Sequence, residues 1–241
     1  RGLLPYEQAQ EAVFCGRGRL IATLAGTLAQ AGLVMVTGAS GAGKTSLLQA
    51  GLMPALARGV QVPGSSSWLR IAMKAGTRPL AELADRLAQL DDRDPAVIRK
   101  GLADAPGDAH LLISEIIQGA GAARLVLVVD QFEEIFAATG QDGARERASF
   151  IDALCAAATR PAGPRGEPPA LVVIAVRGDY WDRCAAYPGL VRAMQQDQVV
   201  VGPMTDADLR QVITGPAQAS GLTVEPDLVE AILADLRSAT D

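Results

Sequence analysis

The chain has 241 residues, of which 49% are hydrophobic and 20% charged, and its formal net charge at pH 7 is -5. This composition is enough for a sizeable buried core, excludes disorder as the main state of the chain, and gives no sign of a broad nucleic-acid surface. No apolar run reaches the roughly 20 residues that cross a bilayer, and the three cysteines lie far apart, so we expect a cytoplasmic protein in a reducing setting without membrane contact.

The first predicted element is a helix over 18–32, where leucine and alanine recur at helical spacing. Five short apolar runs bounded by Gly, Pro or charge then predict buried strands: LVMVTG, WLRIAMK, RLVLVVD, ALVVIAVR and QDQVVVGPM. Four segments between them have helical spacing: GKTSLLQAGLMPALA, PLAELADRLAQL, DAHLLISEIIQGA and ARERASFIDALCAAA. This alternation predicts an α/β fold with a parallel sheet and helices on both faces.

The C-terminal part of the chain has a different pattern. A Pro- and Gly-rich run at 160–169 predicts a mobile loop before the fourth strand. After the fifth strand, TDADLRQVITGPAQ and EPDLVEAILADLRS predict two helices with acidic first turns. We therefore divide the chain into an N-terminal segment with its helix (1–32), an α/β domain (33–204) and the start of a helical subdomain (205–241).

A phosphate-binding pattern follows the first predicted strand. The residues from Gly38 to Thr45 satisfy G-x-x-x-x-G-K-[ST] between a strand and a helix. Backbone N–H groups and the helix N-terminus of such a loop surround nucleotide phosphates; Lys44 then contacts the β- and γ-phosphates during catalysis, and Thr45 ligates Mg²⁺. An accidental Gly-rich turn is the alternative. The predicted nucleotide-binding residues of the loop are Gly38, Ala39, Ser40, Gly41, Ala42, Gly43, Lys44, Thr45 and Ser46.

Charged residues end two further predicted strands at the same edge of the sheet. Asp130 ends RLVLVVD and is the second predicted magnesium ligand. Either Glu133 or Glu134 is predicted to polarise an attacking water, with a slight preference for Glu134, while the other glutamate opens a helix. Arg177 ends ALVVIAVR, where its guanidinium could contact a γ-phosphate. An ordinary ion-paired arginine is the alternative for Arg177.

Five segments together resemble the novel STAND NTPase family of bacteria, which comprises signal-transduction ATPases related to AAA+, NACHT and apoptotic ATPases: RGLLPYEQAQEAVFCGRGRL, GASGAGKTS, VDQFEEIF, AVRGDYWDRCAAYPGL and VGPMTDADLRQVITGPA. The acidic pattern at 130–134 is similar to the NACHT form. The resemblance implies a P-loop NTPase fold, a three-layer αβα sandwich with strand order 5-1-4-3-2, and a helical lid that continues past residue 241. It also implies adenine contacts from Phe14, Gly16 and Arg17, although Gly18 stands where the family usually has an acidic residue.

The resemblance further implies a function. It indicates an ATP/ADP-dependent conformational and oligomerisation switch with slow Mg²⁺-dependent hydrolysis, acting in bacterial signalling or antiphage defence. Self-association would occur in the ATP state, and fused sensor domains, often WD-repeat propellers, and effector domains would lie outside this segment. Three alternatives stay open: an AAA+-type loader or remodeller acting on nucleic acid or protein, a small-molecule phosphotransferase, and a domain that binds nucleotide without hydrolysing it.

Overall fold

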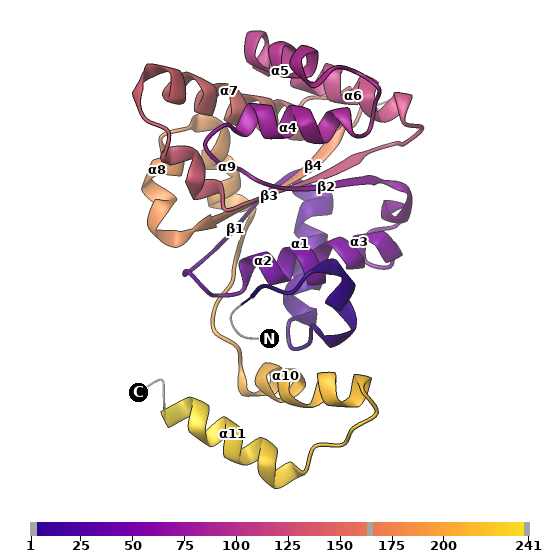
Figure 1. The fold of residues 1–241 in the computed structure, drawn as a ribbon, viewed down its shortest axis with the longest axis vertical. Coiled ribbons are helices and arrows are strands. Elements are labelled where there is room, and N and C mark those ends of the chain that lie inside the picture. Colours follow the sequence, from indigo (N-terminus) through magenta and orange to yellow (C-terminus); the bar gives the residue numbers. More distant parts are fainter. Residues whose placement is uncertain (1–3, 163–165, 239–241) are drawn as a thin grey trace.

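The fold is built on a five-stranded parallel sheet (Figure 1). The structure is a computed structural model that describes residues 4–162 and 166–238; the middle of the loop predicted at 160–169 and both chain ends lie outside this part. The order β2-β3-β4-β1-β5 is the expected 5-1-4-3-2 counted from the other edge. The strands are β1 (Leu33–Gly38), β2 (Leu69–Lys74), β3 (Leu125–Asp130), β4 (Ala170–Arg177) and β5 (Gln198–Val200).

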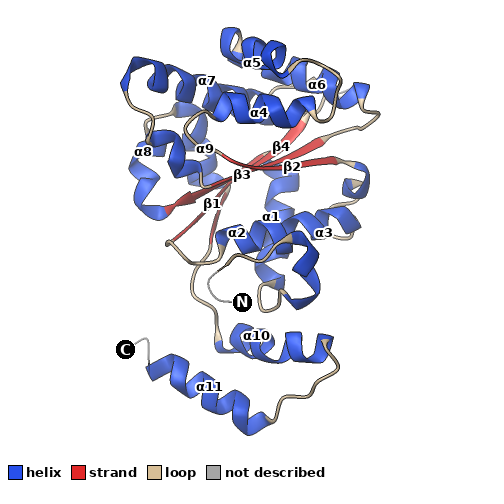
Figure 2. Ribbon diagram, in the orientation of Figure 1, coloured by secondary structure: helices blue, strands red, loops and turns tan. Residues whose placement is uncertain are grey.

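Helices cover both faces of the sheet, as the alternating pattern predicts (Figures 1 and 2). One face carries α1 (Gly18–Ala31) and the continuous helix made of α2 (Lys44–Ser46), the π-helical stretch η2 (Leu47–Leu52) and α3 (Met53–Arg58). The other side carries α4 (Pro79–Ala88), α5 (Pro95–Asp104), α6 (Ala109–Gly119), α7 (Gly140–Thr159), α8 (Trp181–Ala185) and α9 (Pro188–Gln196).

Two separate apolar cores follow from the period-two alternation of strand side chains. In β1, Val34 and Val36 pack with α1 and η2, whereas Leu33 and Met35 pack with the helices on the opposite side. β3 is buried at every position because both of its faces are covered. The two cores therefore hold the central strands in place, and they also hold the edge of the sheet formed by the C-terminal ends of these strands.

Three α-helices in the described part of the chain were not predicted from the sequence. α5 begins at Pro95 behind the N-cap Asp94 and buries only Ile98 and Leu102, so it offers little periodic signal. α8 and α9 lie between β4 and β5, and α8 has a single buried residue, Cys184. Short helices that bury so few side chains lack the repeated apolar face on which the sequence interpretation depends.

The two C-terminal helices lie apart from the sheet (Figure 1). They are α10 (Asp206–Ala219), which begins behind a capping box of Thr205 and Asp208, and α11 (Pro226–Ser238). Ion pairs from Arg210 to Glu230, 2.5 Å apart, and from Arg237 to Asp206 join them. In the described part of the chain, no helix combines the length and apolarity needed to cross a membrane.

α10 packs directly on the backbone of the N-terminal segment at Gly16. A Cβ at Gly16 would lie 2.5 Å from the carbonyl oxygen of Asp208 and 2.7 Å from Cγ2 of Val212, and the residue has φ +81°. Only glycine adopts this backbone geometry without strain. The contact between α10 and the N-terminal segment therefore requires the absence of a side chain at this position.

We expect Gly16→Ala to loosen α10 from the body of the domain. A left-handed conformation costs a residue with a Cβ about 1–2 kcal/mol, so amide exchange in α10 should be at least about fivefold faster. Hydrogen exchange followed by mass spectrometry measures this. The matched control is Gly18→Ala, where a Cβ would meet nothing within 4 Å. Equal protection of α10 in both variants would contradict the packing described here.

Candidate functional site

The glycine-rich loop connects β1 to the helix that begins at Lys44. Gly43 caps this helix with φ +91°, a left-handed conformation that favours glycine. The ammonium of Lys44 donates hydrogen bonds to the carbonyl oxygens of Gly38 and Ala39, each 2.9 Å away. Lys44 therefore reaches back over the loop, which places its positive charge where the loop surrounds phosphate groups.

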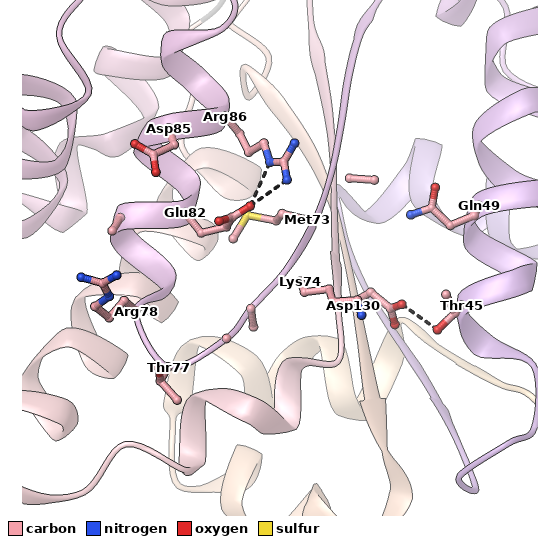
Figure 3. A pocket seen from close by; sticks show the side chains of 14 residues that line it. Thr45, Gln49, Met73, Lys74, Thr77, Arg78, Glu82, Asp85, Arg86 and Asp130 are labelled. Atoms are coloured by element: carbon pink, nitrogen blue, oxygen red, sulfur yellow. Dashed lines mark hydrogen bonds and ion pairs between the residues drawn. The ribbon is translucent and has the colours of Figure 1, made fainter. Parts of the chain in front are cut away.

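Thr45 and Asp130 meet beside the loop (Figure 3). The hydroxyl of Thr45 donates to Oδ2 of Asp130 at 2.7 Å, while Oδ1 of Asp130 accepts the N–H of Gln131 at 2.9 Å. Asp130 is 4% exposed. Among the described residues, no group of three or more His, Cys, Asp or Glu is gathered. One hydroxyl and one carboxylate fit Mg²⁺, which usually takes one or two carboxylates and completes its coordination with phosphate oxygens and water.

The chain turns sharply after Asp130. Gln131 has φ +52° and is, in the described part of the chain, the one residue other than glycine with positive φ. This turn leads into the 3₁₀ helix η5 (Phe132–Phe136), where Phe132 is fully buried. Strain of this kind is found where surrounding structure fixes a functional side chain. Here it directs the start of η5 so that Glu133 is on the side of the loop.

Glu133, rather than Glu134, lines the cavity next to Lys44 and Asp130. One carboxylate oxygen of Glu133 accepts the backbone N–H of Arg177 at 3.2 Å, which ties η5 to the end of β4. Glu134 is half-buried and is not among the residues that line this cavity. The geometry thus favours Glu133 as the residue that polarises water, the reverse of the slight preference from the sequence.

Arg177 lies beside the start of the loop because β1 and β4 pair in register there, Gly38 opposite Arg177. Its guanidinium forms a bidentate ion pair with Asp179, with N–O distances of 3.1 and 2.8 Å, and lies 5.7 Å from the ring centre of Tyr180. The hydrogen bonds that Arg177 donates to Asp179, and the negative charge of Asp179, raise the pKa of Arg177. Asp179 accepts from Nε and Nη2 only, so the Nη1 side of the guanidinium is available to a phosphate while this pair is kept.

A cavity of about 450 Å³, which we call the phosphate cavity, contains most of these groups. Burial lowers the pKa of Lys44 from its ordinary value, and the negative charges of Glu133 and Asp130 oppose that shift. Of the other predicted loop residues, Ala42 packs against the core beneath the sheet. The loop residues that line the phosphate cavity are Ser40, Gly41, Gly43, Lys44, Thr45 and Ser46.

A second cavity of about 560 Å³ adjoins the phosphate cavity and shares Thr45, Lys74 and Asp130 with it (Figure 3). It lies between the end of β2, the start of α4 and the helix that follows the loop. Arg86 and Glu82 form an ion pair across one turn of α4, 2.9 Å apart, in its wall. Both signs of charge are therefore present around this space.

The three residues predicted to contact adenine are in two places. Gly16 and Arg17 line a cavity of about 480 Å³ beneath α10, and Arg17 donates to the carbonyl oxygen of Gly202 at 2.9 Å. Phe14 does not line this cavity. Its ring lies 5.6 Å from the ring of Tyr6 and against the helix that follows the loop. Contact of the three residues with a base stays a prediction.

Several residues that line the phosphate cavity were missed in the sequence. Lys74 ends β2 in register with Asp130, so the argument from strand ends that found Asp130 and Arg177 applied to it equally. Gln131 gave no signal, because its left-handed backbone does not follow from its residue type. Leu4, Pro5 and Tyr6 also line the cavity, although no local sequence pattern predicts that these residues lie beside the loop.

This fold and site define a P-loop NTPase domain: a parallel sheet of order 5-1-4-3-2, a glycine-rich loop after β1, and a Thr–Asp pair beside the loop. The model of the family described as Novel STAND NTPase 1 matches residues 1–241, and the chain belongs to this family. Among solved structures it is similar to the Walker-type ATPase PABY2304 of Pyrococcus abyssi, with a TM-score of 0.58 and 13% identity over 96% of this chain and 65% of that one. A likeness at this identity shows the fold alone. No curated protein matches the sequence.

Proposed function

We propose that this domain binds ATP and ADP with Mg²⁺ and serves as a conformational and oligomerisation switch with slow ATP hydrolysis. The observation that carries the proposal is the phosphate cavity, which gathers Lys44, the Thr45–Asp130 pair, Glu133 and Arg177. Asp130 and Arg177 end neighbouring strands, and the other residues belong to the helical segments that follow β1 and β3. These are the groups that position a nucleotide, a magnesium ion and an attacking water.

Each residue has a distinct role in this proposal. The loop from Gly38 to Ser46 holds the phosphates, and Lys44 neutralises part of their charge. Thr45 and Asp130 would hold Mg²⁺, which supplies further positive charge at the phosphates when it is bound. Glu133 accepts a proton from the water that attacks the γ-phosphate, with its carboxylate aligned through the backbone of Arg177.

The switch depends on contacts that differ between ATP and ADP. A γ-phosphate offers charge to Arg177, and a ligand shifts a two-state equilibrium only through such differential contacts. The lid helix α10 packs on Gly16, next to Arg17, so the N-terminal segment touches both the lid and the helix after the loop. We infer that lid position and self-association follow the nucleotide in a cytoplasmic signalling or antiphage protein with fused sensor and effector domains.

Two measurements on the full-length protein test the switch. Denaturing the freshly purified protein and counting the released nucleotide should give near-stoichiometric ADP, because a resting switch retains its product. Light scattering should then show a larger particle with a non-hydrolysable ATP analogue than with ADP. Identical monomers with both nucleotides, in the presence of the signal that the full-length protein detects, would refute the oligomerisation part of the proposal.

The second cavity in Figure 3 favours one alternative, a phosphotransferase. It adjoins Thr45 and Asp130 and has Lys74, Arg78 and Arg86 in its wall, as an acceptor site for a charged small molecule would require. Labelled γ-phosphate distinguishes the two functions: a hydrolase releases it to water, whereas a transferase passes it to an added acceptor.

A further inference from the structure

The N-terminal end of the described chain forms one wall of the phosphate cavity. We call Leu4, Pro5 and Tyr6 the N-terminal strap. These residues line the same cavity as Glu133 and Arg177, although they are far from them in the sequence. These residues lie outside the loop and the strand ends from which the site was deduced. The strap is therefore an additional component of the phosphate cavity.

A hydrogen bond joins the strap to the glycine-rich loop. The backbone N–H of Tyr6 donates to Oγ of Ser46 at 3.1 Å. Ser46 follows Thr45, whose hydroxyl faces Asp130. The strap is thus attached one residue away from the predicted magnesium ligand.

Packing holds the rest of the N-terminal segment on the same helix. The ring of Tyr6 contacts Phe14 with centroids 5.6 Å apart and planes inclined by 53°. Between them lies the 3₁₀ helix η1 (Gln8–Val13), whose Glu11 forms an ion pair with Arg58 at the end of α3. Helix η1 packs along the helix that begins at Lys44, so the strap leads directly into an anchored element.

The chemistry of the strap suits exclusion rather than binding of phosphate. Leu4 and Pro5 bring apolar side chains to a cavity whose other walls carry Lys44, Asp130 and Arg177. Leu4 is 69% exposed, although large apolar side chains gain by leaving water. An apolar cover over a charged site restricts the entry of water and the passage of a charged ligand.

We propose that the N-terminal strap is a gate on the phosphate side of the nucleotide site that slows nucleotide release. This inference rests on the proposed function, because it assumes that ADP or ATP occupies the phosphate cavity. A nucleotide leaving on this side must displace Leu4–Tyr6 and break the bond between Tyr6 and Ser46. The N-terminal segment that begins with the strap continues to Gly16, which packs against α10, so one segment contacts both the phosphate cavity and the lid.

The test measures release of a fluorescent ADP analogue from the full-length protein after addition of excess unlabelled ADP. Replacing Leu4, Pro5 and Tyr6 by Gly-Ser-Gly keeps the backbone N–H that bonds to Ser46 but removes the apolar side chains of the strap and the ring contact with Phe14. Release should therefore accelerate by at least about fivefold, because the apolar cover of the cavity is lost. Unchanged release in a variant whose thermal unfolding matches the parent would overturn the proposal.

A matched pair of single variants covers the case in which the triple replacement does not fold. Leu4→Ser should accelerate release, whereas Leu222→Ser should not. Leu222 is 64% exposed, close to the 69% of Leu4, and lies between α10 and α11 away from the phosphate cavity. Equal release rates in these two variants would overturn the gate.

One more variant separates failure of the gate from failure of the proposed function. If Lys44→Ala abolishes binding of the ADP analogue while the strap variants release it at the parental rate, the nucleotide site stands and the gate is wrong. If Lys44→Ala binds the analogue as tightly as the parent, the nucleotide is not in the loop, and both the function and the gate are wrong.

Discussion

We expect replacement of Lys44 by alanine to weaken nucleotide binding severely. The ammonium of Lys44 lies over the loop and donates hydrogen bonds to the carbonyl oxygens of Gly38 and Ala39. It is partly buried, with the carboxylates of Glu133 and Asp130 nearby. Hydrogen bonds between charged groups contribute about 1.5–3 kcal/mol each, so loss of those made to the phosphates should weaken ATP binding by roughly 100-fold or more. Isothermal titration of the full-length protein with ATP and Mg²⁺ measures this change.

The control for this variant is Lys100→Ala. Lys100 is on α5, 80% exposed at its side chain and paired with Asp104 at 3.3 Å, and it does not line the phosphate cavity. The substitution Lys100→Ala removes the same charge from the molecule as Lys44→Ala and should leave ATP affinity unchanged. If both variants lost affinity equally, net charge rather than the loop would account for binding, contrary to the site described above.

The second large effect is expected for Glu133→Gln. A positioned general base contributes about 10²–10⁴-fold to a rate, and glutamine keeps the shape of glutamate but accepts no proton. Hydrolysis should therefore fall by that factor while ATP still binds, and the protein should accumulate in its ATP-bound assembled form. Release of inorganic phosphate and particle size, measured on one sample, report both consequences.

Glu134→Gln is the paired variant, because it removes the same charge from the adjacent position. Glu134 does not line the phosphate cavity, so its replacement should change hydrolysis by no more than a few-fold. The opposite result, with Glu134→Gln inactive and Glu133→Gln active, would mean that η5 rotates when the nucleotide binds. In that case the preference drawn from the sequence would be correct.

The ends of the strands were predictable because a buried strand is a short apolar run that stops at a Gly, a Pro or a charged residue. LVMVTG and RLVLVVD gave the bounds of β1 and the position of Asp130, and the parallel alternation brought Asp130 and Arg177 to one edge. The strand order came from the resemblance, since pairing between distant segments leaves no local signal in a single sequence.

The choice between Glu133 and Glu134 was beyond the sequence for a physical reason. It depends on the left-handed backbone of Gln131, which rotates the start of η5. Glu133 and Glu134 are the same residue type at adjacent positions, so only the backbone turn before them decides which side chain faces the phosphate cavity. The N-terminal strap was missed for a related reason: its place beside Ser46 depends on packing of η1 against a helix about forty residues further along.

In the proposed function, a terminal phosphate would approach an arginine that already carries an anion, because Arg177 is paired with Asp179. The carboxylate uses Nε and Nη2, so the phosphate would either share the guanidinium through its remaining N–H groups or displace Asp179. Displacement would exchange one ion pair for another, both screened by added salt, and recognition would then depend less on ionic strength than at a free arginine. Because an exposed pair of this kind is worth about 0–1 kcal/mol, giving up Asp179 would cost little. The contact that Arg177 makes with each nucleotide, and not the pair with Asp179, would then decide the partner of this residue.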